Sequence, residues 1–302
     1  LGMTNIIAPI LSPKEFTEFM IKYKPNHTIT VPTYVEHFVH DRKADSMNWK
    51  CLKNLGIGGD YFPEQSEIYV NEFLKNHGSS SIAEKGYGMT ENSSTAGVCL
   101  VGVNKTNSLG IPLPLNTYGI FERGTDKELK YGEEGEICIT GPTEMLGYLD
   151  NEEEEGKVIK IHSDGKKWIH SEDVGIIDED GFLFFKGRYK RLIPHGGFKL
   201  YPSYIEGVIM KHPDIDNCCV ISIPDKVYGA SPEAHVVIKK DSMSELKKLK
   251  EELIKLCQDK LPSYSQPEDF IFEEDLPLTS VGKVDYKKVE KMRIKKLEES
   301  TK

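Results

Sequence analysis

The sequence lacks the features that mark membrane-spanning, secreted and nucleic-acid-binding proteins. None of its apolar runs approaches the roughly 20 residues that cross a bilayer, and its start, LGMT, has no basic and apolar signal region. Its formal net charge of −9 has the opposite sign to a surface that binds nucleic acid. We therefore expect no membrane span, no nucleic-acid partner and a cytoplasmic location.

The sequence patterns of disulfide frameworks and zinc sites are also missing. The six cysteines are scattered without a C-x-x-C pair, and the nine histidines form no H-E-x-x-H arrangement. Neither a disulfide framework nor a zinc site is expected, which agrees with a reducing compartment. The 302 residues are 38% hydrophobic and 29% charged, a composition typical of a globular chain with one large domain or two ordinary ones.

The first 94 residues alternate helical and strand patterns. Ser12, Pro13 and Glu15 supply an N-cap, a first-turn proline and a capping-box acid, and they predict a helix that ends at Lys24. Strands are then expected over residues 28–34, 51–57 and 80–83, and a second helix over residues 63–76. Strand, helix and strand in this order predict a parallel α/β layer.

The rest of the chain divides into two further regions. Residues 95–189 contain short apolar strands between turn signals, which predict a small β subdomain with a hairpin turn over residues 178–181. We expect the acidic run 151–155 in that region to be a solvated loop. Residues 190–302 predict a compact α+β domain. The expected domains are therefore a large one over residues 1–189, made of an α/β part (1–94) and the β subdomain (95–189), and a small one over residues 190–302.

The small domain contains both element types. We expect a helix near residues 202–211, strands at 218–223 and 234–239, and a long amphipathic helix that opens with a capping box at 242–245. The apolar face of that long helix consists of Leu246, Leu249, Leu253, Cys257 and Leu261.

Two glycine-bearing clusters follow predicted strands of the α/β part. Gly58, Gly59 and Asp60 lie where a strand ends, and glycine there lets the backbone approach a flat ligand. Residues 86–92 (GYGMTEN) combine an aromatic ring for a base, a hydroxyl for a phosphate and a carboxylate for Mg²⁺. A glycine turn and a polar turn are the alternative structural explanations.

Two more clusters lie towards the C-terminus. Asp173, after the polar residues 170–172 of the segment that begins at Trp168, has the chemistry to accept hydrogen bonds from a ribose diol, and Arg188 has the chemistry to pair with a phosphate. The alternative for Arg188 and Lys190 is an exposed basic turn. Lys283 follows Gly282 in a proline-bounded turn that can deliver a mobile cation, although the segment does not match a G-K-[ST] phosphate loop.

In order and spacing these clusters resemble the adenylate-forming superfamily of acyl-CoA synthetases, nonribosomal-peptide adenylation domains and firefly luciferase. The resemblance covers nearly the whole chain. Its landmarks are Gly58-Gly59, residues 87–91 (YGMTE), 171–173 (SED), 187–190 (GRYK), 196–197 (GG) with 201–206 (YPSYIE), and 276–277 (LP) with 282–283 (GK).

The resemblance implies a fold and an activity. The fold is the remainder of a large α/β adenylate-forming domain, followed by a small mobile α+β domain. The activity is ATP-dependent conversion of a small-molecule carboxylic acid to acyl-AMP, followed by thioester formation with coenzyme A. ATP or AMP, Mg²⁺ and coenzyme A are the implied cofactors. The chemistry requires like charges to be brought together, which cations and orientation make possible.

Each matching residue acquires an implied role. Thr90 would bind a phosphate oxygen, Glu91 would hold Mg²⁺, and Lys283 would reach the carboxylate and the α-phosphate. Lys190 would be the hinge between the two domains, and Gly196 and Gly197 would belong to the loop that faces the thiol in the second step. The implied nucleotide-binding set is Gly58, Gly59, Asp60, Tyr87, Gly88, Thr90, Asp173 and Arg188.

The sequence departs from the family pattern in three places. The usual Thr-Gly-Asp is Ser171-Glu172-Asp173, and the second lysine of many relatives is replaced by Pro194-His195. The Ser/Thr/Gly-rich phosphate loop that ends in Pro-Lys has no counterpart in residues 1–51. We therefore expect the chain to be the C-terminal portion of an acyl-CoA ligase. The alternatives are a noncatalytic nucleotide-binding or interaction module, and an amino-acid adenylation domain of a peptide synthetase.

Overall fold

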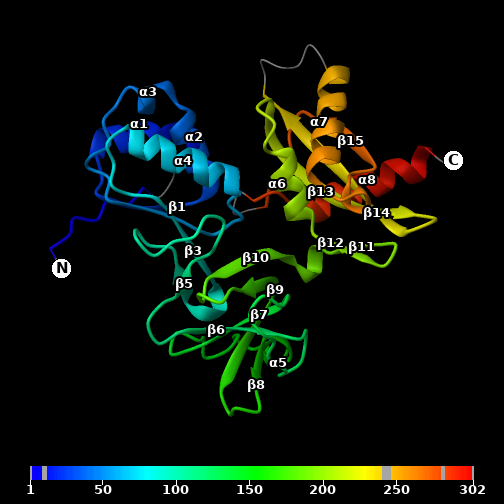
Figure 1. Ribbon diagram of the computed structural model, residues 1–302, viewed down its shortest axis with the longest axis horizontal. Coiled ribbons are helices and arrows are strands. Elements are labelled where there is room, and N and C mark those ends of the chain that lie inside the picture. Colours follow the sequence, from blue (N-terminus) through cyan, green and yellow to red (C-terminus); the bar gives the residue numbers. More distant parts are fainter. Residues whose placement is uncertain (1, 9–11, 240–245, 280–282, 301–302) are drawn as a thin grey trace. The chain divides into compact units, whose positions relative to one another are not determined.

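The structure is a computed structural model that describes residues 2–8, 12–239, 246–279 and 283–300. The chain forms two compact units (Figure 1). The first unit comprises residues 1–171 and 176–185, and the second comprises residues 172–175 and 186–302. In the described part of the chain, no helix is long and apolar enough to cross a membrane.

The first part of the first unit is a five-stranded mixed sheet in the order β1-β2-β3-β4-β5, and helices pack against one face of its parallel half. Strands β1, β2 and β3 are paired in parallel, as the sequence predicts, but the third strand begins at Ala83, where the strand expected over residues 80–83 was to end. Leu55 and Ile57 of β2 point into a core formed with the helices, whereas Ile29 of β1 is exposed. The elements are α1 (Pro13–Tyr23), β1 (His27–Thr30), α2 (Pro32–His40), α3 (Arg42–Asp45), β2 (Asn54–Ile57), α4 (Glu64–Asn76), β3 (Ala83–Met89), η1 (Thr90–Asn92), β4 (Ser94–Val98) and β5 (Ile111–Pro112).

Local sequence sets the ends of these elements. Ser12 and Glu15 form the predicted capping box at the start of α1, and Lys24 caps the helix in the left-handed conformation. The predicted strand 28–34 is wrong after Thr30. Pro32 occupies the first turn of α2 instead, where its missing N–H leaves no helical hydrogen bond unmade.

Strand β3 changes its partner along its length. It pairs in parallel with β2 up to Lys85 and antiparallel with β4 from Gly86 onward. A β carbon on Gly88 would lie 1.8 Å from the carbonyl oxygen of Ser94, so only glycine permits this close approach. Buried Lys85 also donates to Glu67 of α4 at 2.6 Å, which fixes the strand to the helix layer.

The second part of the first unit is the predicted β subdomain. Its sheet has the order β10-β9-β7-β6, with β8 paired to β9. Ile137 and Ile139 of β7 face the main core of the subdomain, whereas Cys138 packs with Phe121 and Trp168 in a separate cluster. The elements are β6 (Thr117–Phe121), β7 (Gly135–Thr140), α5 (Glu152–Val158), β8 (Ile159–Ile161), β9 (Lys167–Ile177) and β10 (Leu183–Arg188).

Helix α5 forms where the acidic run predicted a loop, so that prediction is wrong. Asn151 caps the helix by accepting a hydrogen bond from the backbone N–H of Glu154. The acidic residues occupy the first turn, where negative charge interacts favourably with the helix N-terminus. Lys157 pairs with Glu153 and Glu154 one turn away.

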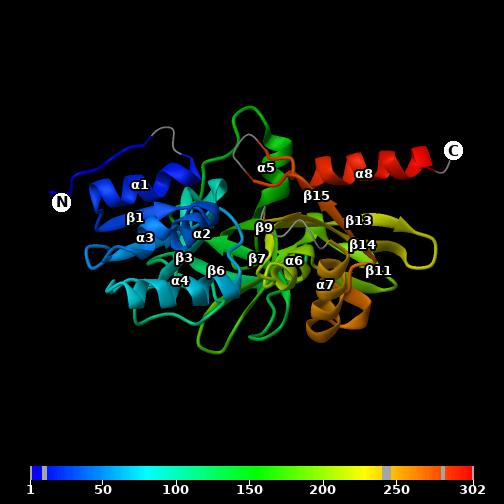
Figure 2. The ribbon, with the colours of Figure 1, turned by 90° about the horizontal axis from the view of Figure 1, so that it is seen from above.

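The second unit is an α+β layer with helices on both faces of its sheet. The sheet has the order β12-β11-β14-β13, and β15 pairs with β14. Figure 2 shows α8 on one side of β13 to β15 and α6 and α7 on the other. The elements are η2 (Tyr189–Arg191), β11 (Ile193–His195), β12 (Phe198–Leu200), α6 (Pro202–Ile209), β13 (Ile215–Asp225), β14 (Gly229–Ile238), α7 (Leu246–Lys260), η4 (Ser263–Ser265), β15 (Asp269–Glu273) and α8 (Tyr286–Ser300).

The apolar face predicted for α7 is largely present. Leu249, Leu253, Cys257 and Leu261 are buried in the main core of the second unit, whereas Leu246 is exposed. The capping box expected at residues 242–245 lies outside the described residues.

A buried ionic network fastens α8 to the sheet. Both carboxylate oxygens of Glu233 on β14 accept hydrogen bonds from Arg293 of α8, at 2.7 and 2.8 Å, and one also bonds His235 at 3.1 Å. Burial by itself would raise the pKa of Glu233. The hydrogen bonds from His235 and Arg293 outweigh that effect and lower the pKa to about 2.

Glu172 of β9 adopts an unusual backbone conformation for a non-glycine residue. Its φ of 56° lies in the left-handed region. This is the position where the family pattern has glycine, so the conformation expected of that glycine is present although the residue is not. Its side chain pairs with Lys190 at 2.5 Å, but the Lys190 side chain is largely exposed and that of Glu172 is half-buried, and pairs open to solvent contribute little stability.

The Glu233 network makes stability depend on pH. The folded pKa of Glu233 lies below its ordinary value, so its contribution is present above pH ~4.5 and is lost as pH falls towards ~2. Replacing Glu233 with Gln should therefore reduce the slope of the free energy of unfolding between pH 4 and 3 by about 1.4 kcal/mol per pH unit. Urea unfolding across this range measures the slope. The exposed Glu251→Gln variant should behave like the wild type.

The backbone at Glu172 can be tested with a matched pair of variants. Glu172→Gly and Glu172→Ala both remove the pair with Lys190, but only glycine relieves the left-handed strain. The glycine variant should have a free energy of unfolding about 1 kcal/mol larger than that of the alanine variant. Equal stabilities in urea unfolding would show that the site carries no strain.

Candidate functional site

The glycines after β2 form a backbone ledge beside β3. The N–H of Gly58 donates to the carbonyl of Thr30 at 3.1 Å, and a β carbon on Gly58 would lie 3.6 Å from the carbonyl oxygen of Gly86. Gly59 has a φ of 83°, which favours glycine. The predicted pair thus lies at the carboxyl ends of adjacent parallel strands, where α/β sheets bind ligands.

Asp60 makes a local contact. Its side chain is exposed, and its Oδ1 accepts a hydrogen bond from the backbone N–H of Tyr61 at 2.8 Å. The ring of Tyr61 lies 6.0 Å from that of Phe185, centroid to centroid. Asp60 therefore stabilises the turn that follows Gly58 and Gly59.

Tyr87 and Gly88 have structural roles of their own. The Tyr87 ring is 8% exposed and packs edge-on against Tyr118, with centroids 6.1 Å apart. Gly88 is required by the close approach of β4 described above. Packing of the sheet therefore requires Tyr87 and Gly88 whether or not a ligand binds beside them.

Glu91 is held in place by a residue that no sequence motif indicated. Tyr148 donates its hydroxyl hydrogen to Oε1 of Glu91 at 2.5 Å, and the backbone N–H of Met145 donates to the Glu91 carbonyl at 2.8 Å. Burial, and then the hydrogen bond to Glu91, raise the pKa of Tyr148 to about 12. The hydroxyl therefore stays a donor at neutral pH, and the half-buried carboxylate is oriented beside the exposed Thr90.

In the second unit, Asp173 pairs with Arg188. Asp173 is 5% exposed on β9, and its Oδ1 lies 2.9 Å from Nε of Arg188 at the end of β10. The Arg188 side chain is 60% exposed, so the arginine presents much of its surface to solvent. The family resemblance implies that Arg188 lies close to Asp173, and the structure has them paired.

Lys190 and Arg191, consecutive in η2, have opposite surroundings. Lys190 is exposed and pairs with Glu172. Arg191 is largely buried, donates twice to the carboxylate of Glu206, at 3.2 and 2.5 Å, and lies over the ring of Tyr286. Arg191 fixes η2 to the second unit, and it is a residue that the sequence reasoning missed.

Gly196 and Gly197 form the turn of a two-residue hairpin. His195 pairs with Phe198 across the turn, and the two glycines have φ of 54° and 88°. Positive φ at both central residues is the type I′ geometry that favours glycine. The turn itself thus explains both glycines.

Lys283 lies on another loop of the second unit. Its backbone N–H donates to the side chain of Thr279 at 3.2 Å, its carbonyl accepts from the Thr279 N–H, and its side chain is exposed. A bridge between Leu278 and Val284 closes the loop. Gly282, which precedes Lys283 in the predicted motif, lies outside the described residues.

Comparison with known proteins identifies family-level similarity in both units. The model for AMP-binding enzymes matches residues 1–149, and the model for the AMP-binding enzyme C-terminal domain matches residues 204–283. Together these two models match most of the chain.

Two curated relatives are CoA ligases by name. The chain is 32% identical over 285 residues to the probable 4-coumarate–CoA ligase 1 of Dictyostelium discoideum. The aligned region covers 94% of this chain and 50% of that relative. It is 30% identical over 302 residues to the long-chain-fatty-acid–CoA ligase of Bacillus subtilis (strain 168), and this alignment covers 100% of the chain and 50% of the relative. The chain therefore spans about half the length of these relatives.

A solved structure gives the same result for the fold. The ATP-bound RpMatB-BxBclM chimera B1 superposes with a TM-score of 0.81 at 25% identity, covering 95% of this chain and 54% of that one. The predicted fold class, an α/β portion followed by a small α+β portion, is thereby confirmed. With family models over most of its length, CoA ligases among its relatives and this shared fold, the chain belongs to the AMP-binding, adenylate-forming enzyme family.

Proposed function

We propose that the chain contributes to the two-step conversion of a carboxylic acid to its coenzyme A thioester, as a portion of an acyl-CoA ligase. In the first step a carboxylate oxygen bonds to the α-phosphorus of ATP, and pyrophosphate leaves. In the second, the thiol sulfur of coenzyme A bonds to the acyl carbon, its proton is lost, and AMP leaves. The names of the relatives favour an aryl or fatty acid as substrate.

The observation that carries this proposal is the arrangement at the ends of β2 and β3. Gly58 and Gly59 lie beside the strand that leads directly to Thr90 and Glu91. A backbone ledge, a hydroxyl and an oriented carboxylate thus occur at the edge of the sheet where ligands bind in this type of fold. This is the set of groups that a nucleotide phosphate with its cation requires.

Glu91 fits the proposed magnesium site. Mg²⁺ prefers oxygen ligands and is commonly bound by one or two carboxylates together with substrate phosphates. The Tyr148 hydroxyl orients one oxygen of the Glu91 carboxylate. When bound, the ion would supply positive charge against the phosphates of ATP.

The second unit would supply the remaining groups. Asp173 would accept hydrogen bonds from the ribose hydroxyls, with Arg188 beside it, and the exposed Lys283 would neutralise the carboxylate and the α-phosphate. We further propose that Lys190 is the hinge residue and that the turn at Gly196 and Gly197 faces coenzyme A in the second step.

The ribose role of Asp173 predicts a selective loss of affinity. Asp173→Asn should weaken AMP binding at least tenfold, because hydrogen bonds to charged groups contribute about 1.5–3 kcal/mol. Binding of 2′,3′-dideoxy-AMP, which lacks the diol, should change much less. Calorimetric titration of both nucleotides measures the difference, with the exposed Asp216→Asn as the control variant. Equal losses for the two nucleotides would exclude contact with the ribose.

The proposed function itself is tested by ATP–pyrophosphate exchange with the complete enzyme and a panel of fatty, aryl and amino acids. Lys283→Ala should lower exchange about 100-fold or more, the effect of removing a transition-state charge partner, whereas the exposed Lys211→Ala should not. An unchanged rate in the Lys283 variant would contradict its role. Exchange driven only by amino acids would indicate a peptide-synthetase adenylation domain. Absence of exchange with every acid would indicate a noncatalytic module, which AMP binding would identify as nucleotide-binding and its absence as an interaction module.

A further inference from the structure

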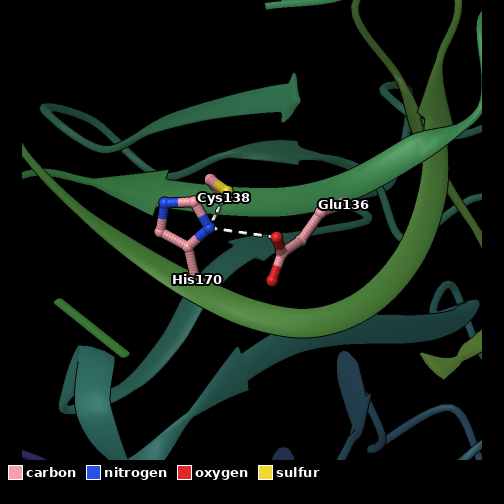
Figure 3. A group of neighbouring side chains, drawn as sticks. All are labelled: Glu136, Cys138 and His170. Carbon is pink, nitrogen blue, oxygen red and sulfur yellow. Dashed lines mark hydrogen bonds and ion pairs between the residues drawn. The ribbon is translucent and has the colours of Figure 1, made fainter. Parts of the chain in front are cut away.

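A cluster of metal-ligating side chains lies on the sheet of the β subdomain, on the face of β7 opposite Ile137 and Ile139. Glu136 and Cys138 are two residues apart on β7 and share that face, and His170 lies on the neighbouring strand β9. Figure 3 shows the His170 ring beside both side chains. The three residues are 2%, 0% and 3% exposed, and the proposed adenylation chemistry uses none of them.

The separations of the ligand atoms suit one small cation. Nδ1 of His170 lies 3.5 Å from Sγ of Cys138 and 3.0 Å from Oε2 of Glu136, and the three ligand atoms all lie within 4.8 Å of one another. Zinc–ligand bonds of normal length at tetrahedral angles place ligand atoms about 3.3–3.6 Å apart. Shifts of a few tenths of an ångström up to roughly 1 Å would therefore bring these three atoms to the separations of ligands on one zinc ion.

A second layer of groups orients these ligands. Nε2 of His170 lies 2.9 Å from Nε2 of His162, so His170 can donate there while Nδ1 binds a metal. The backbone N–H of Gly124 donates to Glu136 at 3.2 Å. The rings of Phe121 and Trp168 pack on His162 at 4.6 and 5.5 Å between centroids, which excludes water from this side.

The donor set selects the kind of cation. One thiolate, one imidazole and one carboxylate are ligands of zinc and similar transition metals, whereas Mg²⁺ and Ca²⁺ take oxygen ligands only. A divalent cation would also balance the two negative charges that the thiolate and the carboxylate bring into a buried site. Burial raises the pKa of Cys138, so the sulfur is a thiol until a metal replaces its proton, which passes to solvent.

We propose that Glu136, Cys138 and His170 supply three ligands of a zinc ion that joins β7 to β9, with the fourth coordination position left to a water molecule. The proposal departs from the expectation, drawn from the missing C-x-x-C pairs, that the chain has no zinc site. Residue spacing could not indicate this cluster, because His170 comes from another strand, 32 residues after Cys138. It is independent of the proposed function.

Cobalt substitution in the full chain tests the proposal. The protein, freed of metal and refolded with Co²⁺, should bind one ion per chain and show a thiolate-to-cobalt charge-transfer band. Cys138→Ser should abolish the band, and Cys99→Ser, which changes another buried cysteine of the same unit, should retain it. Zinc should raise the midpoint of thermal unfolding of the wild type and Cys99→Ser but not of Cys138→Ser.

A second variant guards against misfolding of the first. Glu136→Gln keeps the shape of the side chain and should weaken zinc binding at least tenfold, with circular dichroism confirming that the variant is folded. Absence of bound metal in the wild type, cobalt bound without the charge-transfer band, or a band that persists in Cys138→Ser would each overturn the proposal. In those cases the cluster is a metal-free hydrogen-bonded pair of Glu136 and His170.

Discussion

Strand β3 pairs with a parallel neighbour over its first residues and with an antiparallel neighbour over its last ones, and the arrangement of the first unit depends on this change. The parallel half aligns the end of β2 with the middle of β3, which brings Gly58 next to Gly86. The antiparallel half requires Gly88, because β4 approaches too closely for any side chain. The chain then turns directly into η1, where Glu91 is exposed enough to meet a ligand and is fixed by Tyr148.

The ion pairs of the second unit differ in how far they are buried. Arg191 is held by the mostly buried Glu206 and Arg293 by the buried Glu233, and removing one partner of such a pair leaves an uncompensated charge. Arg188 and Lys190 are more exposed and pair with two consecutive acids of β9. The buried pairs thus fix η2 and α8 rigidly, while the exposed pairs leave their cations able to exchange partners with a charged ligand.

The β subdomain shows how one strand can serve two environments. Successive residues of β7 point to opposite faces, so its isoleucines build the main core while Glu136 and Cys138 face Trp168 and His170. Polar groups on the second face are acceptable only because they bond to one another. The adenylating chemistry of the family does not explain why this face carries ligand-type side chains, which a bound zinc ion would explain.

Local patterns determined much of the fold. The capping box at Ser12, the glycine pair at 196–197 and the hairpin turn at 178–181 depend on residues close together in the chain, so the sequence predicts them directly. Prediction from local sequence failed where the same residues are compatible with two kinds of structure. Pro32 begins a helix rather than interrupting a strand, and the acidic run around Glu153 is stabilised by the helix dipole rather than by solvent alone.

The sequence by itself also determined the order of the family-type motifs, since that order requires no knowledge of contacts. Only the tertiary structure decided that Tyr148 holds Glu91, that Arg191 pairs with Glu206, and that a histidine of β9 meets Glu136 and Cys138. These partners are separated by 15 to 57 positions along the chain. Their meeting depends on strand register and helix packing, which arise from the cooperative burial of many side chains and not from any local pattern.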